Sequence, residues 1–277
     1  MIPFDFEYYR PDSIGEALEA FRQLEAQGKN PVYYGGGTEL ISMARVGNLS
    51  FGAVIDLKSI PECRVLECDK ENRLVLGSAL TLSDLTESKR FPLMEKAAGR
   101  IADHTIQCKI TLGGNLASTI IYRETVLPLL LADSTAVVAC ADGLREYPIR
   151  RIFDRKLNLP KGDFLVSVKV ENRYISAPYF HIKKTRNEKI DYPLITASGM
   201  KVGGKLRIAF SGLLPYPFRS EQAENLLNEP TGYLQRAEKV VNFLSKDIMG
   251  DLNGSAEYRK FVLENTLVSV LETMEDA

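Results

Sequence analysis

The chain has 277 residues, of which 45% are hydrophobic and 26% charged, values that suit one large or two ordinary globular domains. Its formal net charge is −1, so the composition predicts no binding of nucleic acid or of an anionic membrane surface. The most apolar window, residues 126–141, contains Pro128 and Asp133 and is too short to cross a bilayer, so we expect no membrane contact.

The N-terminal residues lack the basic segment and apolar stretch of a signal peptide, and we therefore expect a cytoplasmic protein. Residues 11–30 predict the first helix. Ser13 and Glu16 form a capping box, and apolar residues follow at helical spacing. Gly28 is the predicted stop of this helix.

A short strand is predicted at residues 32–34, followed by three glycines, the start of a helix and a buried strand at residues 53–57. The sequence GGGTEL at residues 35–40 is neither the fingerprint GxGxxG nor a P-loop, because position 40 is Leu and no Gly-Lys-Ser/Thr follows. Glycines nevertheless let backbone N–H groups approach phosphate oxygens, and a helix N-terminus favours an anion. Thr38 adds a hydroxyl donor. The stretch predicts either a phosphate site or a simple tight turn.

The middle of the chain predicts several strands and a second glycine stretch. Strands at residues 63–68 and 73–80 are joined by a polar turn, and a second capping box follows at residues 81–84. Residues 109–118 are predicted as a strand that enters Gly113-Gly114. Helices are expected at residues 92–101 and 124–133, and further strands at 136–142, 145–153, 162–170 and 179–186.

The sequence TLGGN at residues 111–115 repeats the composition of the first stretch: a hydroxyl, an apolar residue, two glycines and a short polar side chain. Two such stretches, each after a strand, are suited to clasping a diphosphate from two sides. The alternative is two unrelated turns.

From about residue 190 the pattern changes again. Residues 194–213 predict a β-hairpin around Gly203-Gly204. Helical stretches follow at residues 219–228, 231–246 and 255–272. We place a domain boundary near residue 175, with neither a long linker nor an internal repeat.

The residues suited to metal binding or acid–base catalysis are few. None of the four cysteines forms a C-x₂-C pair, and the chain has two histidines and no tryptophan. We therefore expect no metal site and no catalytic side chain, and redox or group-transfer chemistry would come from a bound cofactor.

The chain resembles the FAD-binding subunits of molybdenum hydroxylases, such as xanthine, carbon monoxide and nicotinate dehydrogenases. The family's first FAD motif, roughly A-G-G-T/H-D/S-L, is matched by residues 35–40. Its second, T-I-G-G-N/D-L, is matched by residues 111–116. Flanking similarity covers residues 4–18 and 211–227, so the resemblance spans nearly the whole chain.

The resemblance implies an α+β fold in which two N-terminal subdomains (PCMH type) hold FAD, followed by a C-terminal domain of a three-stranded sheet with a helical bundle. The implied domains are residues 1–174, with subdomains of about 1–58 and 59–174, and residues 175–277. Glu124 aligns with a family Asp near the flavin and is one methylene longer, and Lys183 aligns with a family Lys. The implied FAD-binding residues are Tyr33, Tyr34, Gly35, Gly36, Gly37, Thr38, Glu39, Leu40, Ile101, Thr111, Gly113, Gly114, Asn115, Glu124, Leu165 and Lys183.

Several of these residues have a simpler interpretation as well. Tyr33 and Tyr34 are suited to strand packing, Glu124 to a helix N-terminus, and Lys183 to a solvated surface position beside Lys184.

The resemblance further implies an electron-transfer role. Electrons would pass from [2Fe–2S] clusters on a small partner subunit through FAD to NAD⁺ or another acceptor, and molybdopterin would lie on a large partner subunit. One alternative is a stand-alone flavin reductase or oxidase, such as UDP-N-acetylenolpyruvoylglucosamine reductase, although the substrate-binding arginines and proton donor of that family are not found. Another is a non-catalytic electron-transfer or assembly module.

Overall fold

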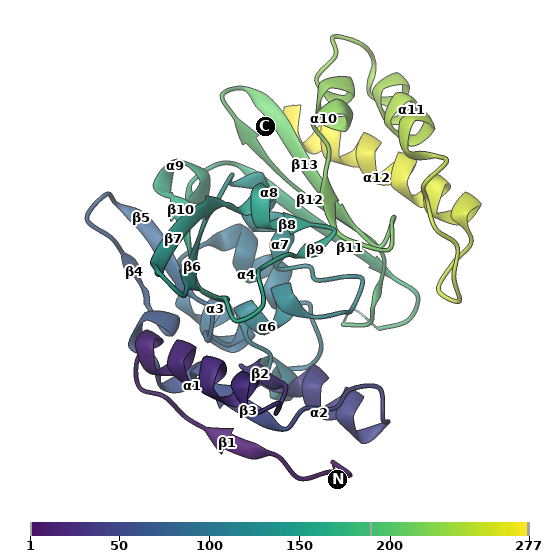
Figure 1. Cartoon of the computed structure of the whole chain (residues 1–277). Helices are drawn as coiled ribbons and strands as arrows, with labels where there is room; N and C mark the ends of the chain where they lie inside the picture. The colour runs from purple at the N-terminus through teal and green to yellow at the C-terminus, as the bar shows by residue number, and fades with distance from the viewer. Residues whose placement is uncertain (1, 189, 276–277) are drawn as a thin grey trace.

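The computed structural model describes residues 2–188 and 190–275. It contains three parts that follow one another along the chain and in space (Figure 1). The first is a parallel sheet of order β1-β3-β2. Its elements are β1 (Glu7–Tyr9), α1 (Ile14–Ala26), β2 (Pro31–Tyr34), α2 (Thr38–Arg45) and β3 (Ala53–Asp56), followed by the short 3₁₀ turns η1 (Leu57–Ser59) and η2 (Pro61–Cys63).

Helix α1 forms where the capping box predicted it. The Ser13 hydroxyl accepts a hydrogen bond from the Glu16 N–H at 3.2 Å, and Ala17, Phe21 and Leu24 form the buried face. The three-residue strand β1 was not predicted, because its alternation is too short to be recognised without its partner β3.

The second part is an antiparallel sheet of order β4-β5-β10-β6-β7 with helices packed on it. Its strands are β4 (Leu66–Cys68), β5 (Arg73–Gly77), β6 (Thr135–Cys140), β7 (Gly143–Pro148) and β10 (Phe164–Glu171), and β8 (Phe153–Asp154) pairs with β9 (Lys156–Leu157) in a small separate sheet. Its helices are α3 (Leu82–Ser88), α4 (Pro92–Ala98), α5 (His104–Gln107), α6 (Leu112–Ala117), α7 (Val126–Leu131), α8 (Ile149–Ile152) and α9 (Asn172–Ile175).

One predicted strand in this part was wrong, and another was predicted too long. The strand expected to enter the second glycine stretch is absent: Thr111 forms one isolated bridge to Thr81, and α6 begins at the next residue. The reason is that the Thr111 hydroxyl caps this helix by accepting from the Gly114 N–H. The strand expected at residues 145–153 ends at Pro148, where α8 begins.

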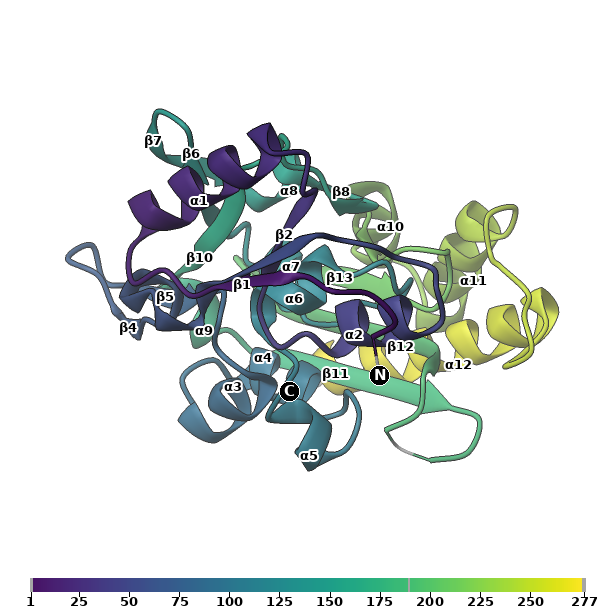
Figure 2. The ribbon, with the colours of Figure 1, turned by 60° about the horizontal axis from the view of Figure 1, so that its bottom comes forward.

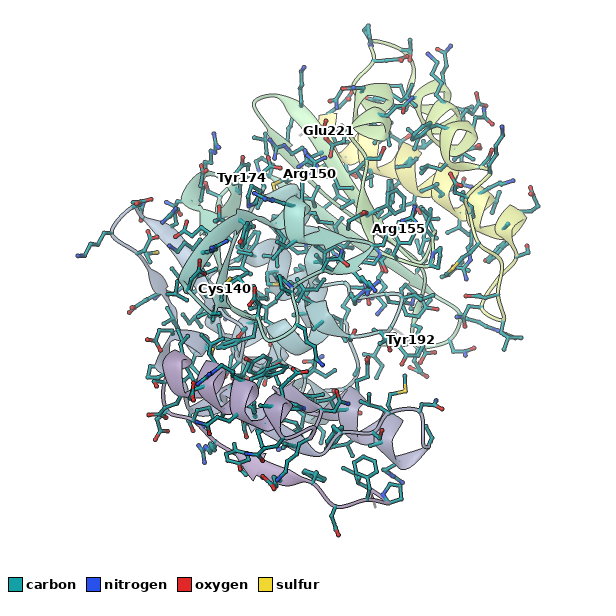
Figure 3. All side chains as sticks on the ribbon, viewed as in Figure 1. Cys140, Arg150, Arg155, Tyr174, Tyr192 and Glu221 are labelled. Carbon is teal, nitrogen blue, oxygen red and sulfur yellow. The ribbon has the colours of Figure 1, made fainter. Side chains whose placement is uncertain are left out.

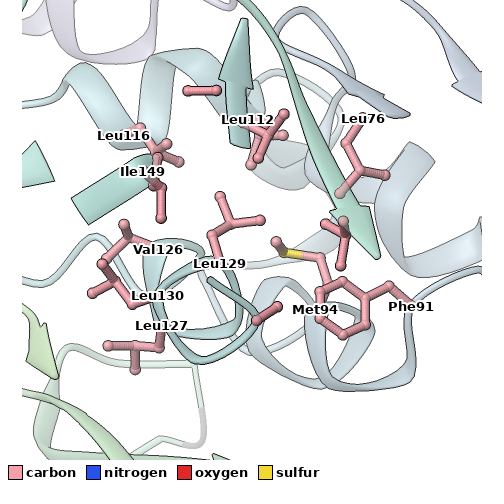
Figure 4. Packing of buried hydrophobic residues seen from close by; sticks show 14 of the residues in the cluster. Leu76, Phe91, Met94, Leu112, Leu116, Val126, Leu127, Leu129, Leu130 and Ile149 are labelled. Carbon is pink, nitrogen blue, oxygen red and sulfur yellow. The ribbon is translucent and has the colours of Figure 1, made fainter. Parts of the chain in front are cut away.

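The main core of the second part lies between the sheet and its helices. Leu112 and Leu116 of α6 pack in one cluster with α7 side chains such as Leu127, and with Met94 of α4 (Figure 4). One face of α6 is therefore fixed in the core, which leaves the opposite face, with Gly114, exposed.

The third part is a sheet of order β11-β12-β13-β14 covered by three helices, which lie at one end of the molecule (Figure 1). The three long strands and the hairpin at Gly203-Gly204 were predicted, and both glycines have positive φ, of 57° and 77°, as this turn requires. The two-residue edge strand β14 was not. The elements are β11 (Tyr179–Thr185), β12 (Pro193–Val202), β13 (Lys205–Ser211), β14 (Phe218–Arg219), α10 (Glu221–Leu227), α11 (Tyr233–Leu244) and α12 (Ala256–Glu275).

The third part is docked onto the second through α4, which contacts β11, and α7, which contacts β12, β13 and β14 (Figure 2). Charged pairs reinforce the contact. Asp133, just after α7, accepts from Arg207 of β13 and Arg219 of β14, and Arg150 of α8 pairs with Glu221 of α10 (Figure 3). Across residues 2–188 and 190–275, no helix has the length and apolar character needed to cross a membrane.

Candidate functional site

The two glycine stretches meet in the structure although they are far apart in sequence. A Cβ atom added at Gly36 would lie 1.5 Å from the Lys109 carbonyl oxygen, and one at Gly35 would lie 2.4 Å from the Thr111 hydroxyl oxygen. Glycine is therefore needed at both positions, because the Lys109 backbone passes directly against Gly36 and the Thr111 side chain against Gly35.

The first stretch has unused hydrogen-bond donors. Gly37 has the left-handed φ of 73° and caps α2, whose first helical bond runs from the Ile41 N–H to the Gly37 carbonyl at 2.9 Å. In the described part of the chain, the N–H groups of residues 36–40 have no acceptor. Such a row of free amides at the start of a helix is suited to binding an anion.

In the second stretch, the N–H groups of residues 113–115 already have acceptors. The Gly113 N–H donates to the Ser78 carbonyl at 2.8 Å, and the Gly114 N–H to the Thr111 hydroxyl at 3.1 Å. The Asn115 N–H donates to the Thr111 carbonyl at 2.8 Å. A Cβ at Gly114 would lie 2.8 Å from the Thr111 hydroxyl oxygen and would meet no other atom within 4 Å, so exposed Gly114 is open except at this helix cap.

Together these features fit a diphosphate. The first stretch offers amide donors without acceptors, and the second offers exposed Gly114, while its Gly113 packs against Ser78. The sequence predicts one role for both stretches, whereas their hydrogen-bond donors differ in the structure.

Glu39 and Arg123 hold one peptide group between them. The Glu39 carboxylate accepts from the Thr119 N–H at 2.7 Å, and the Arg123 guanidinium donates to the Ser118 carbonyl at 3.1 Å. Arg123 also donates to the Arg155 carbonyl at 2.5 Å. Burial lowers the pKa of Arg123, while Glu39 acts to raise it. Glu39 thus links the residues that follow α6 to α2. Its carboxylate accepts no hydrogen bond from the N–H groups of residues 36–40.

Tyr33 and Tyr34 behave differently. Tyr33 is packed inside, since its ring lies 5.0 Å from that of Phe21 and its hydroxyl donates to the Gly162 carbonyl at 2.7 Å. The Tyr34 ring lies against Gly37, where a Cβ atom would approach it to 2.3 Å.

A hydrogen-bond network of Lys58, Asp56 and Tyr8 contacts the first stretch, and the sequence pattern did not predict it. The Lys58 ammonium donates to the Gly35 carbonyl and to the Asp56 carboxylate, and the Tyr8 hydroxyl also donates to Asp56. The hydrogen bond to Asp56, together with burial, raises the pKa of Tyr8 to about 12. The available signal was that Asp56 ends a buried strand next to β2, where parallel pairing places it beside Tyr34.

Glu124 and Lys183 form a buried ion pair between the second and third parts. The Lys183 ammonium donates to the Glu124 carboxylate at 2.8 Å and to the Arg100 carbonyl at 2.7 Å. The Thr196 hydroxyl donates to the other Glu124 oxygen at 2.6 Å. The two charged side chains are only 1% and 4% exposed. Burial raises the pKa of Glu124, and Lys183 opposes this change. The interpretation of Lys183 as a solvated surface residue is wrong.

His181 lies in the same interface. Its Nδ1 is 2.8 Å from the Ser198 hydroxyl, and its Nε2 is buried without a partner among the described residues. Burial, followed by the charges of Arg100 and nearby lysines, lowers the pKa of His181 to about 3. The ring is therefore neutral at ordinary pH.

The remaining predicted site residues support the surrounding structure. Leu165 is buried in the main core and Ile101 packs against it. The buried Asn115 accepts from the Thr125 hydroxyl at 2.6 Å, which links α6 to the start of α7. Leu40 is half-buried in α2. Within the described residues, no group of three or more His, Cys, Asp or Glu side chains is placed to hold a metal ion.

Comparison with known proteins gives consistent results. Residues 4–171 match the model of the family described as "FAD binding domain in molybdopterin dehydrogenase". The chain is 23% identical to the xanthine dehydrogenase FAD-binding subunit of Escherichia coli O157:H7, over 97% of this chain and 96% of that protein. It is 34% identical to the carbon monoxide dehydrogenase medium chain of Hydrogenophaga pseudoflava, over 42% of this chain and 41% of that one.

The structure also resembles a solved chain of carbon monoxide dehydrogenase from Hydrogenophaga pseudoflava. The TM-score is 0.85 at 24% identity, and the match covers 97% of this chain and 96% of the other. The likeness therefore extends over the third part, beyond the segment that the family model covers.

Proposed function

The chain belongs to the family of FAD-binding domains in molybdopterin dehydrogenases, and we propose that it is the FAD-bearing electron-transfer subunit of a molybdenum hydroxylase. Its fold is the α+β, PCMH-type FAD-binding fold with a C-terminal sheet and helices, as the resemblance implied, and that sheet has a fourth short strand, β14. The proposed FAD-binding part is residues 1–174, with subdomains of about 1–58 and 59–174, and residues 175–277 form the proposed C-terminal domain.

The observation that carries the proposal is the row of unpaired N–H groups at residues 36–40, in a stretch that packs beside the second glycine stretch and its exposed Gly114. A diphosphate is the part of FAD that such donors would hold, because it carries negative charge and several acceptor oxygens. Bound FAD would supply the redox chemistry, since flavins accept and release electrons.

The protein's own residues would bind and orient the cofactor. Gly35–Leu40 would hold the diphosphate, and the small residues of the second stretch would allow its close approach. Glu39 and Arg123 fix the peptide between Ser118 and Thr119, so the end of α6 cannot move independently of α2. We keep the other predicted FAD contacts, including Glu124 and Lys183, as proposals.

The wider role follows from the relatives. The homologues are named as subunits of xanthine and carbon monoxide dehydrogenases, and we propose corresponding partners here: a large molybdopterin subunit and a small [2Fe–2S] subunit. FAD would receive electrons from the iron–sulfur clusters and deliver them to NAD⁺ or another acceptor. A cytoplasmic location would agree with this role.

The test begins with the purified chain. We expect flavin to be bound at close to one per chain after reconstitution with FAD, and NADH to drive reduction of an artificial dye. The chain without partners should not oxidise xanthine or nicotinate. A chain that cannot be loaded with FAD would contradict the proposal, whereas FAD binding without NADH activity would point to another electron acceptor.

A further inference from the structure

Lys58 occupies an unusual position at the first glycine stretch. It lies in η1, directly after β3, and its ammonium donates to the Gly35 carbonyl oxygen at 2.8 Å. The same ammonium lies 2.8 Å from both carboxylate oxygens of Asp56 and 4.3 Å from the centre of the Tyr34 ring. Its location is therefore fixed by three groups: a carbonyl, a carboxylate and an aromatic ring.

The hydrogen bond to Gly35 has a consequence for the next residue. All described peptide bonds are trans, and in a trans peptide the C=O and N–H groups point in opposite directions. Since the Gly35 carbonyl points toward Lys58, the Gly36 N–H of the same peptide points away from it. That N–H is the first of the row of donors without an acceptor.

The peptide between Gly35 and Gly36 needs a group that holds its orientation. Gly35 and Gly36 lack the Cβ atoms that restrict other residues, so their shared peptide can rotate more easily than a peptide between other residues. A rotation of this peptide would turn the carbonyl oxygen toward the place of the amide and present an acceptor to an anion. A cation held on the Gly35 carbonyl opposes that rotation.

Because Asp56 pairs with Lys58, the contribution of Lys58 is to orient the Gly35 carbonyl and not to attract an anion by its charge. Asp56 is buried, with only 3% of its surface exposed, and it also accepts from the Tyr8 hydroxyl at 2.6 Å. Its carboxylate neutralises the Lys58 charge at close range, which weakens direct attraction between Lys58 and an anion. The hydrogen bond to Gly35 remains as the specific contribution.

We propose that Lys58 is a positioning residue for FAD: by holding the Gly35 carbonyl, it orients the Gly35–Gly36 peptide so that the Gly36 N–H donates to the cofactor diphosphate. This inference rests on the proposed function and adds a residue outside both glycine motifs. It predicts that a hydrogen-bond donor at position 58 matters more than its charge.

The experiment compares three variants in FAD and ADP titrations. Lys58→Met removes the donor, Lys58→Gln keeps a donor without the charge, and Lys29→Met is the matched control. Lys29 has the same 33% side-chain exposure and is also paired with a carboxylate, that of Glu7, but it does not contact the glycine stretches.

We expect Lys58→Met to raise the dissociation constants of FAD and ADP about tenfold each, because both ligands carry the diphosphate. Lys58→Gln should stay within about threefold of the wild type, and Lys29→Met should not differ from it. A Lys58→Met affinity equal to that of the wild type would overturn the inference, as would equal losses in Lys58→Gln and Lys58→Met. Failure of the wild-type chain to bind FAD would instead reject the proposed function.

A measurement on the wild-type protein covers the case in which Lys58→Met does not fold. With ¹⁵N-labelled glycine, the Gly36 amide proton resonance should move downfield when ADP is added, as a new hydrogen bond to a charged oxygen requires. An unchanged Gly36 resonance in the presence of saturating ADP would overturn the inference.

Discussion

The first glycine stretch and the buried cluster around Glu124 and Lys183 differ in whether their polar groups already have partners. In the glycine stretch, the N–H groups of residues 36–40 have no acceptor within the described structure. In the cluster, Glu124, Lys183 and Thr196 bond to one another across the interface between the second part and the C-terminal domain. The open region is suited to binding, and the closed one to holding the two parts together.

The difference shows how two kinds of polar site are stabilised. Amides at a helix start can stay unpaired where water can reach them, and Gly36 and residues 38–40 are half-buried, although Gly37 is buried. A buried carboxylate and ammonium cannot, because an isolated charge inside a protein is far less stable than in water. The four experiments below test this comparison, from the largest expected effect to the smallest.

Gly36→Ala should have the largest effect, since its new methyl group would overlap the Lys109 carbonyl oxygen at 1.5 Å. Backbone on both sides must move, so we expect loss of FAD binding together with a large loss of stability, measured by thermal unfolding. Gly232→Ala is the control, because no atom lies within 4 Å of a Cβ at that position. A Gly36→Ala protein as stable as this control would show that the two stretches do not pack as described.

Lys183→Met should destabilise the protein by about 3–5 kcal/mol, because it leaves the Glu124 carboxylate buried without its cation. Chemical denaturation of the FAD-free protein measures this loss. Lys184→Met is the matched control, since the neighbouring Lys184 is exposed. Equal stability of the two variants, with weaker FAD binding only in Lys183→Met, would mean that Lys183 serves the cofactor and not the interface.

His181→Asn should flatten the pH dependence of stability. The pKa of His181 is about 3 in the folded protein, against about 6.5 when unfolded, so between these values only the unfolded chain binds the proton. The free energy of unfolding should therefore fall as the pH falls, by up to about 1.4 kcal/mol per pH unit from this residue. Denaturation at several pH values should show this slope reduced in His181→Asn and kept in His104→Asn, a change at an exposed position. Identical slopes would contradict the buried, neutral state of His181.

Gly114→Ala should have the smallest effect on stability, about 1 kcal/mol, because its added Cβ would lie 2.8 Å from one atom, the Thr111 hydroxyl oxygen, and the cost is that of a displaced helix cap. The added methyl group would occupy the proposed path of the diphosphate, and we expect FAD affinity to fall about tenfold. Gly15→Ala, early in α1 and with no atom within 4 Å of its added Cβ, is the control for both measurements. Unchanged FAD affinity in Gly114→Ala would remove the second stretch from the binding site.

The sequence by itself determined the local features of this protein. The capping box at Thr81, the cap at Ser13 and the glycine hairpin at residues 203 and 204 depend on nearby residues, and the structure contains all three. The capping box predicted at Ser13 is half formed, because the Glu16 carboxylate accepts from the Asp12 N–H instead of the Ser13 N–H. The two glycine motifs were also recognisable, because each is a short continuous pattern with a direct physical use.

Only the tertiary structure decided how distant residues combine. That Gly36 touches Lys109, that Glu39 binds the Thr119 amide, and that Lys183 is buried against Glu124 all depend on packing between elements far apart in the chain. The same holds for the wrong strand at residues 109–118, since Thr111 is extended but pairs only with Thr81, and a helix begins at Leu112. Hydrogen bonds between sequence-distant groups leave no periodic pattern in the sequence. Only the tertiary structure therefore shows that the amides of the first glycine stretch lack acceptors, while Glu124 and Lys183 are paired.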